Sequence, residues 1–104
     1  MHFIVTAHDG KDSEAPLRRQ AVREEHLAGV KRLIKAGRHL FGAAILDDDN
    51  QMIGSLLIVD YPSRDALVNE WLSSEPYVTG KVWESIDIQP CKVPGFFLDT
   101  NIVK

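Results

Sequence analysis

Cysteine is almost absent from this 104-residue chain, in which Cys91 is the only one. A single cysteine excludes an intramolecular disulfide and a zinc site built from several cysteines. Long hydrophobic runs are missing too, since none approaches the roughly 20 apolar residues that span a bilayer. Met1 does not open a signal-peptide pattern either. We therefore expect a cytoplasmic protein with no membrane partner.

An excess of basic residues is also lacking. The chain has 12 lysines and arginines against 15 aspartates and glutamates, a formal net charge of −3, so it carries no basic footprint for nucleic acid. It has no phosphate-binding glycine loop, no Gly-x-Ser-x-Gly elbow and no His-Glu-x-x-His motif. The acidic run 47–49 has neither the glycine nor the glutamate of a calcium loop. We expect no nucleic-acid partner, no metal and no cofactor.

What the chain does contain is typical of one globular domain over residues 1–104, with 44% apolar and 26% charged residues. Alternating or β-branched runs, broken by turn residues, predict strands, and runs of good helix formers predict helices. The expected strands cover 2–8, 40–46, 52–59 and 82–89, and the expected helices cover 17–36 and a segment after Ser63. This β-α-β-β-α-β order predicts an α+β ferredoxin-like sandwich, with both helices on one face of an antiparallel sheet. Residues 92–104 form a C-terminal tail.

The two middle strands, 40–46 and 52–59, are apolar at successive positions. Successive side chains point to opposite faces of a sheet, so the face without helices is too apolar to be left in water. A second copy of the chain is the simplest cover, which predicts a homodimer with the two sheets face to face. The alternative is that the tail segment Phe96-Phe97-Leu98 folds over that face.

The expected helix 17–36 carries an unusual polar wedge. Its apolar arc contains Val22, Leu27, Val30, Leu33 and Ile34. His26 lies near the middle of this arc, flanked by Arg19 and Arg23. A buried imidazole needs hydrogen-bond partners, and a buried guanidinium needs an anion or a solvated cavity. The wedge therefore predicts a polar pocket, and the alternative for His26 is an ordinary core histidine whose hydrogen bonds are satisfied.

The run Arg19-x3-Arg23-x2-His26-Leu27 is followed by Gly54-Ser55 in a strand and by Glu75-Pro76-Tyr77-Val78-x-Gly80. This order resembles the YciI-like family over about residues 1–92. The resemblance implies a ferredoxin-like fold that dimerises as an α+β barrel, with a cleft that holds a histidine–acid pair. It maps the family histidine to His26 and the family serine to Ser55, and it places Glu75 where the family usually has aspartate. Gly42-Ala43-Ala44 stands where the family often has Gly-Pro, and the tail is longer than in the family.

A carboxylate bound to one imidazole nitrogen fixes the tautomer and makes the other nitrogen a better base. We therefore expect His26 and Glu75 to be the catalytic pair of a small cofactor-free enzyme, lyase-like in chemistry. Arg23 and Arg19 would hold a small anionic or phenolic substrate, to which Ser55 would donate a hydrogen bond. The resemblance supports this chemistry, since a minority of the family is similar to lyases that act on hydroxylated, halogenated rings.

Two non-catalytic readings use the same residues. One is a small-molecule-binding or regulatory dimer, and the other is an accessory protein whose pocket is vestigial. The pocket residues do not separate an enzyme from a sensor, whereas a filled, dry space around His26 would favour the accessory protein.

Overall fold

The computed structural model of the chain describes residues 1–99. Strand β1 (His2–Asp9) leads into the long helix α1 (Ala15–Lys35), which is followed by the hairpin of β2 (His39–Leu46) and β3 (Met52–Asp60). Three short helical pieces come next, α2 (Arg64–Glu70), the 3₁₀ turn η1 (Leu72–Ser74) and α3 (Pro76–Thr79). Strand β4 (Trp83–Cys91) and the short α4 (Gly95–Leu98) complete the described part.

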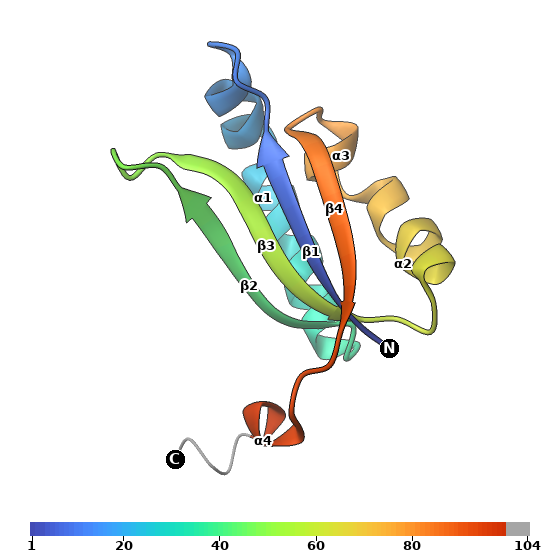
Figure 1. Cartoon of the computed structure of the whole chain (residues 1–104). Helices are drawn as coiled ribbons and strands as arrows, with labels where there is room; N and C mark the ends of the chain where they lie inside the picture. The colour runs from blue at the N-terminus through green and yellow to red at the C-terminus, as the bar shows by residue number, and fades with distance from the viewer. Residues whose placement is uncertain (100–104) are drawn as a thin grey trace.

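The four strands form one sheet in the order β2-β3-β1-β4, and every neighbouring pair is antiparallel. Helices α1, α2 and α3 lie together on one face of this sheet (Figure 1). The α+β ferredoxin-like sandwich predicted from the order of elements is therefore confirmed. Within residues 1–99, no helix is long and apolar enough to cross a membrane.

Helix α1 begins and ends where local chemistry allows it. Pro16 lies in the first turn, where its missing N–H costs nothing. At the other end Gly37 adopts a positive φ of 76°, a conformation that glycine reaches without the penalty of a Cβ. The N–H groups of Gly37 and Arg38 then bond back to the carbonyls of Ile34 and Leu33, which closes the helix.

The second helical region is more broken than the single helix that we expected after Ser63. The Ser63 hydroxyl caps α2 by accepting from the N–H of Ala66 at 3.0 Å, as its position predicts. The backbone then leaves the helix at Trp71 and restarts twice. The last restart is capped by Glu75, whose side chain accepts from the N–H of Tyr77 at 3.1 Å. This cap fixes Glu75 beside α1.

The core lies between the helices and the sheet. It is built from alternate residues of β1 and β3 together with aromatic side chains from the segments that follow β3. Its most buried large members are Phe3, Val5, Val59, Tyr61, Leu67, Tyr77 and Val82. Trp71 and Trp83 are buried as well.

The helix-free face is apolar over three strands only. Strand register places Phe41 and Ala43 of β2, Leu56 and Ile58 of β3 and Ile4 of β1 on that face. Phe41 is 62% exposed there. On β4 the same face carries Ser85, Asp87 and Gln89, which lie opposite His8, Thr6 and Ile4. The expected apolar face is therefore present, but it stops at β4.

The tail does not provide the cover that we considered as an alternative. Helix α4 lies beyond the end of the sheet, away from its helix-free face (Figure 1). Phe96 and Phe97 pack against each other with ring centroids 4.7 Å apart and remain exposed. The tail alternative is therefore wrong for the described residues, while residues 100–104 lie outside them.

Candidate active site

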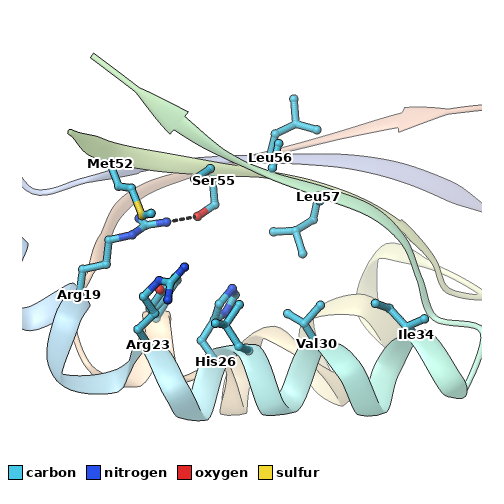
Figure 2. A pocket seen from close by; sticks show the side chains of 14 residues that line it. Arg19, Arg23, His26, Val30, Ile34, Met52, Ser55, Leu56 and Leu57 are labelled. Atoms are coloured by element: carbon cyan, nitrogen blue, oxygen red, sulfur yellow. Dashed lines mark hydrogen bonds between the residues drawn. The ribbon is translucent and has the colours of Figure 1, made fainter. Parts of the chain in front are cut away.

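A cleft of about 280 Å³ opens between α1 and the strands β2 and β3. Figure 2 shows the side chains of α1 pointing toward the sheet across this space, with Arg19 and Arg23 at one end and Ile34 at the other. Residues of β3 line the cleft from the other side: Ser55 and Met52 lie near the arginines, and Leu57 lies opposite Val30. The polar wedge predicted on this helix therefore does border a cavity.

His26 and Glu75, the predicted pair, are in contact. His26 Nδ1 lies 2.5 Å from Oε1 of Glu75, and the two side chains are only 9% and 3% exposed. The additional methylene of glutamate does not separate them, because Glu75 begins α3 directly beside α1. With Nδ1 bound to the carboxylate, Nε2 is the ring nitrogen left for a molecule in the cleft, which His26 lines.

Glu75 is held as an anion by three donors. Burial by itself would raise the pKa of this carboxyl, but hydrogen bonds from His26, Trp71 and Tyr77 more than offset burial and lower the pKa below its usual value. Trp71 donates its indole N–H to Oε2 at 2.8 Å, and the backbone N–H of Tyr77 donates to Oε1. A carboxylate can only accept, so His26 Nδ1 carries the hydrogen, and Nε2 is the ring nitrogen that can take up or release a proton.

Aromatic rings fix the plane of the imidazole. The Tyr77 ring stacks on His26 with centroids 3.9 Å apart and planes 11° from parallel. Trp83 meets His26 edge-on at 6.1 Å. Burial raises the pKa of Tyr77, against the opposing effect of Arg19 and Arg23, so its phenol stays protonated. Tyr77 therefore forms a wall of the site.

Arg19 has a buried partner that sequence reasoning missed. Its Nη1 is 2.9 Å from both carboxylate oxygens of Asp9, the last residue of β1. Its Nη2 donates to the carbonyl of Gly54 at 3.2 Å and to the Ser55 hydroxyl at 3.0 Å. The charge of Arg19 is thus matched inside the protein. In the sequence, Asp9-Gly10 is a turn signal, which gives no indication that Asp9 also pairs with Arg19.

Arg23 is the cation that remains for a ligand. It lines the cleft and is half-buried, and it has no ion-pair or hydrogen-bond partner among residues 1–99. The opposite end of the cleft is apolar and includes Leu27, Val30 and Ile34. Gly42 and Ala44, from the segment that departs from the family pattern, also line it. The cleft thus offers a positive end, a basic nitrogen and an apolar end.

A second buried histidine was not anticipated. His39 is 3% exposed and lies edge-on to Trp71, with ring centroids 4.6 Å apart. Within the described chain neither of its ring nitrogens has a hydrogen-bond partner, and the same holds for the hydroxyl of the neighbouring Tyr61. Burial lowers the pKa of His39 from 6.5 to about 4. Among residues 1–99 no group of three or more metal-ligating side chains comes together.

Comparison with known proteins decides the family. The YCII-related domain matches residues 1–92. The chain belongs to this family. Protein YciI of Escherichia coli and an uncharacterised protein of Haemophilus influenzae are each 30% identical to it over 98 residues, which cover 88% of this chain and 97% of each relative. Protein YciI of Shigella flexneri is similar to the same extent.

Among solved structures, the fold of this YCII-related chain is similar to a dehydrochlorinase from Burkholderia phenoliruptrix. That enzyme acts on 5-chloro-2-hydroxyhydroquinone and was solved in complex with 2,5-dihydroxybenzoquinone. The TM-score is 0.76 at 21% identity, over 92% of this chain and 98% of the other. At this identity the likeness shows the shared fold. Residues 93–99, which include α4, lie beyond the family match.

Proposed function

We propose that this protein is a small cofactor-free enzyme in which His26 and Glu75 perform general acid/base chemistry on a small anionic or phenolic substrate. The observation that carries the proposal is the buried His26–Glu75 contact on the wall of a cleft that also holds the unpaired Arg23. An imidazole that lines a cleft and is bound to a carboxylate through Nδ1 is arranged to accept a proton at Nε2 from a bound molecule. The resulting imidazolium is stabilised by the adjacent carboxylate.

The proposed reaction is lyase-like. His26 Nε2 removes the proton of a ring hydroxyl and returns it to the ring carbon that carries a halide. A second hydroxyl then loses its proton to Nε2 while the halide departs with its bonding electron pair. The net change is the loss of one proton and one halide ion, and no oxidant is required. The structural neighbour is a dehydrochlorinase of a hydroxylated ring, which supports this substrate class.

Arg23 has the role of holding a negative charge on the substrate, because its guanidinium borders the cleft without an internal partner among residues 1–99. Arg19 also borders the cleft, but Asp9 already neutralises it. We therefore assign Arg19 to shaping the site and Arg23 to binding the anion. The volume of about 280 Å³ accommodates one substituted aromatic ring.

The proposal is tested by measuring the rate of halide release from halogenated hydroquinones and hydroxyquinols for the wild type and for single-residue variants. We expect His26→Ala and Glu75→Gln each to lower kcat by roughly 10²–10⁴-fold, the usual contribution of general acid/base catalysis. Arg23→Ala should mainly raise KM. The exposed His8 lies outside the cleft, so His8→Ala is the matched control and should keep wild-type activity.

The outcomes separate the proposal from a binding module. Ligand binding that is lost in Arg23→Ala, with no turnover of any substrate in the wild type, would contradict the enzyme and favour a small-molecule sensor. Turnover that survives in a folded His26→Ala variant would exclude the histidine as the base. Thermal unfolding of each variant confirms that the fold is retained.

We also propose that the functional unit is a homodimer formed through the helix-free face. The support is the apolar patch on β1, β2 and β3, in which the large side chain of Phe41 is 62% exposed. A contiguous exposed patch of this kind marks a protein–protein interface more often than a bare surface. Sedimentation of the full chain over a range of concentrations should give twice the monomer mass of 11.7 kDa. A monomer mass at every concentration would reject the dimer.

A further inference from the structure

The hydroxyl of Ser55 is a polar group on the cleft wall that receives two hydrogen bonds from neighbouring side chains. It is 4% exposed and lines the cleft from β3. Its hydroxyl oxygen receives a hydrogen bond from Arg19 Nη2 at 3.0 Å and another from the indole N–H of Trp83 at 3.3 Å. Figure 2 shows the first of these bonds at the end of the cleft where Arg23 lies.

The two neighbours leave the hydroxyl only one way to act. A serine hydroxyl has one O–H donor and two lone pairs, whereas guanidinium and indole groups have donors alone. Both bonds must therefore be accepted by Ser55, and they occupy both lone pairs. The O–H remains, and within residues 1–99 it has no acceptor. A buried donor without a partner is costly, so a bound molecule that supplies an acceptor is favoured.

We propose that Ser55 is a specificity-determining residue that acts only as a hydrogen-bond donor, and that it selects ligands with an acceptor oxygen at this position. Arg19 and Trp83 are the positioning residues that set this polarity. The inference rests on the proposed function, because it assumes that the cleft binds a small molecule. It goes further by fixing the ligand group opposite Ser55 as a carbonyl, phenol or phenolate oxygen and by disfavouring an amine there.

Neither positioning residue is free to turn away and release a lone pair. The guanidinium of Arg19 is fixed by Asp9 on one side and by the Gly54 carbonyl on the other, and it also lies over the Tyr77 ring, 4.7 Å from the centroid. The Trp83 indole is buried and meets the rings of His26 and Tyr77 edge-on. The polarity of Ser55 is thus built into the wall of the site.

The test uses two probes of equal size, phenol and aniline, in NMR titrations at pH 7, where both are neutral. The phenol oxygen accepts a hydrogen bond readily, whereas the aniline nitrogen is mainly a donor. We expect the wild type to bind phenol roughly fivefold to tenfold more tightly than aniline, which corresponds to about one neutral hydrogen bond. Ser55→Ala should bring this ratio close to one. Ser85, exposed on β4, lies outside the cleft, so Ser85→Ala is the matched control and should keep the wild-type ratio.

Trp83→Phe separates positioning from simple packing. It removes the N–H that occupies one lone pair of Ser55, so the hydroxyl regains the ability to accept. Aniline should then bind relatively better and the ratio should fall, whereas a purely structural defect weakens both probes alike and leaves the ratio unchanged.

The outcomes keep this inference apart from the proposed function. Equal affinity of the wild type for the two probes, or an unchanged ratio in a folded Ser55→Ala variant, would overturn the assignment of Ser55 alone. An unchanged ratio in a folded Trp83→Phe variant would overturn the positioning role. Failure of the wild type to bind either probe would overturn the ligand-binding cleft and the inference together.

Discussion

His39 is the residue whose burial has the clearest energetic consequence. Its imidazole lies among Tyr61 and Trp71 with no hydrogen-bond partner for either nitrogen within residues 1–99. Charging this ring inside the protein is unfavourable, which lowers its pKa to about 4. An unfolded chain protonates the same residue near 6.5. Between these two pH values the unfolded state therefore binds more protons than the folded state. The free energy of unfolding must decrease as the pH is lowered through this window.

We predict a loss of about 2 kcal/mol in the free energy of unfolding between pH 7 and pH 5 from His39 alone. The contribution of neutral His39 to stability is fully present above pH 6.5 and declines as the pH falls toward 4. His39→Phe keeps an aromatic ring against Trp71 but does not titrate, so it should remove this part of the decline. Urea denaturation at the two pH values measures the effect.

The pH range of the decline distinguishes the effect of His39 from that of Glu75 in the His26–Glu75 pair. Glu75 has a lowered pKa, so its stabilising contribution is present above its unfolded value of 4.5 and is lost only below that value. His8→Phe, at an exposed position, controls for the added aromatic ring and should decline as the wild type does. A His39→Phe variant that loses as much stability as the wild type would show that other groups cause the decline.

At this scale the sequence identified the residues that bear chemistry better than those that support them. Helical spacing placed Arg19, Arg23 and His26 on one face, and the structure places all three on the cleft. The contact between His26 and Glu75 followed only from the family resemblance, since 49 positions separate them. Asp9 could not be predicted, because its pairing with Arg19 depends on how closely β1 approaches α1.

At the scale of elements, the close approach of β3 to β1 depends on Gly54. A Cβ at this position would lie 2.4 Å from the carbonyl oxygen of Ala7 on β1. Backbone atoms cannot move aside as a flexible side chain can. Gly54 also precedes Ser55, and its carbonyl accepts a hydrogen bond from Arg19. The pairing of the two strands and the polar end of the cleft therefore both depend on this glycine.

We predict that Gly54→Ala destabilises the protein by about 1–3 kcal/mol, the usual cost of overpacking a buried site. Gly29 provides the matched substitution, because it lies inside α1 and a Cβ there meets only the end of Arg32 at 3.6 Å. Gly29→Ala should stabilise the protein by about 0.5–1 kcal/mol, since alanine favours helix interiors. Chemical denaturation of both variants gives the two signs, and a shift in the same direction for both would refute the steric argument.

The sequence predicted the strands and α1 more accurately than the helical region after Ser63. Strands and α1 follow periodicity and end at turn residues, so their expected positions match the structure closely. The region after Ser63 was expected to form one helix, yet it breaks at Trp71. There the indole N–H of Trp71 donates to the Glu75 carboxylate, and both side chains are buried. Tertiary contacts of this kind override local helix propensity.

At the scale of the whole molecule, two exposed apolar surfaces compete as sites of association. One is the patch on the helix-free face, and the other is the pair Phe96 and Phe97 on α4, outside the family match. The apolar runs of the two middle strands predicted a sheet face too apolar to be left in water, and strand register locates that face on β1, β2 and β3. The polar side chains on β4 limit this surface to part of the sheet.

We predict that the sheet surface forms the dimer and that the tail does not. Phe41→Glu places a charge on the apolar patch at β2, where a face-to-face interface would leave it without a partner, and should convert the dimer to a monomer. Phe97→Glu makes the same change at a position that is 72% exposed and away from the sheet, and it should leave the mass unchanged. Sedimentation of the two variants at equal concentration compares them directly. Dissociation by Phe97→Glu together with a stable dimer in Phe41→Glu would transfer the interface to α4, because each substitution introduces the same charge and differs only in where it stands.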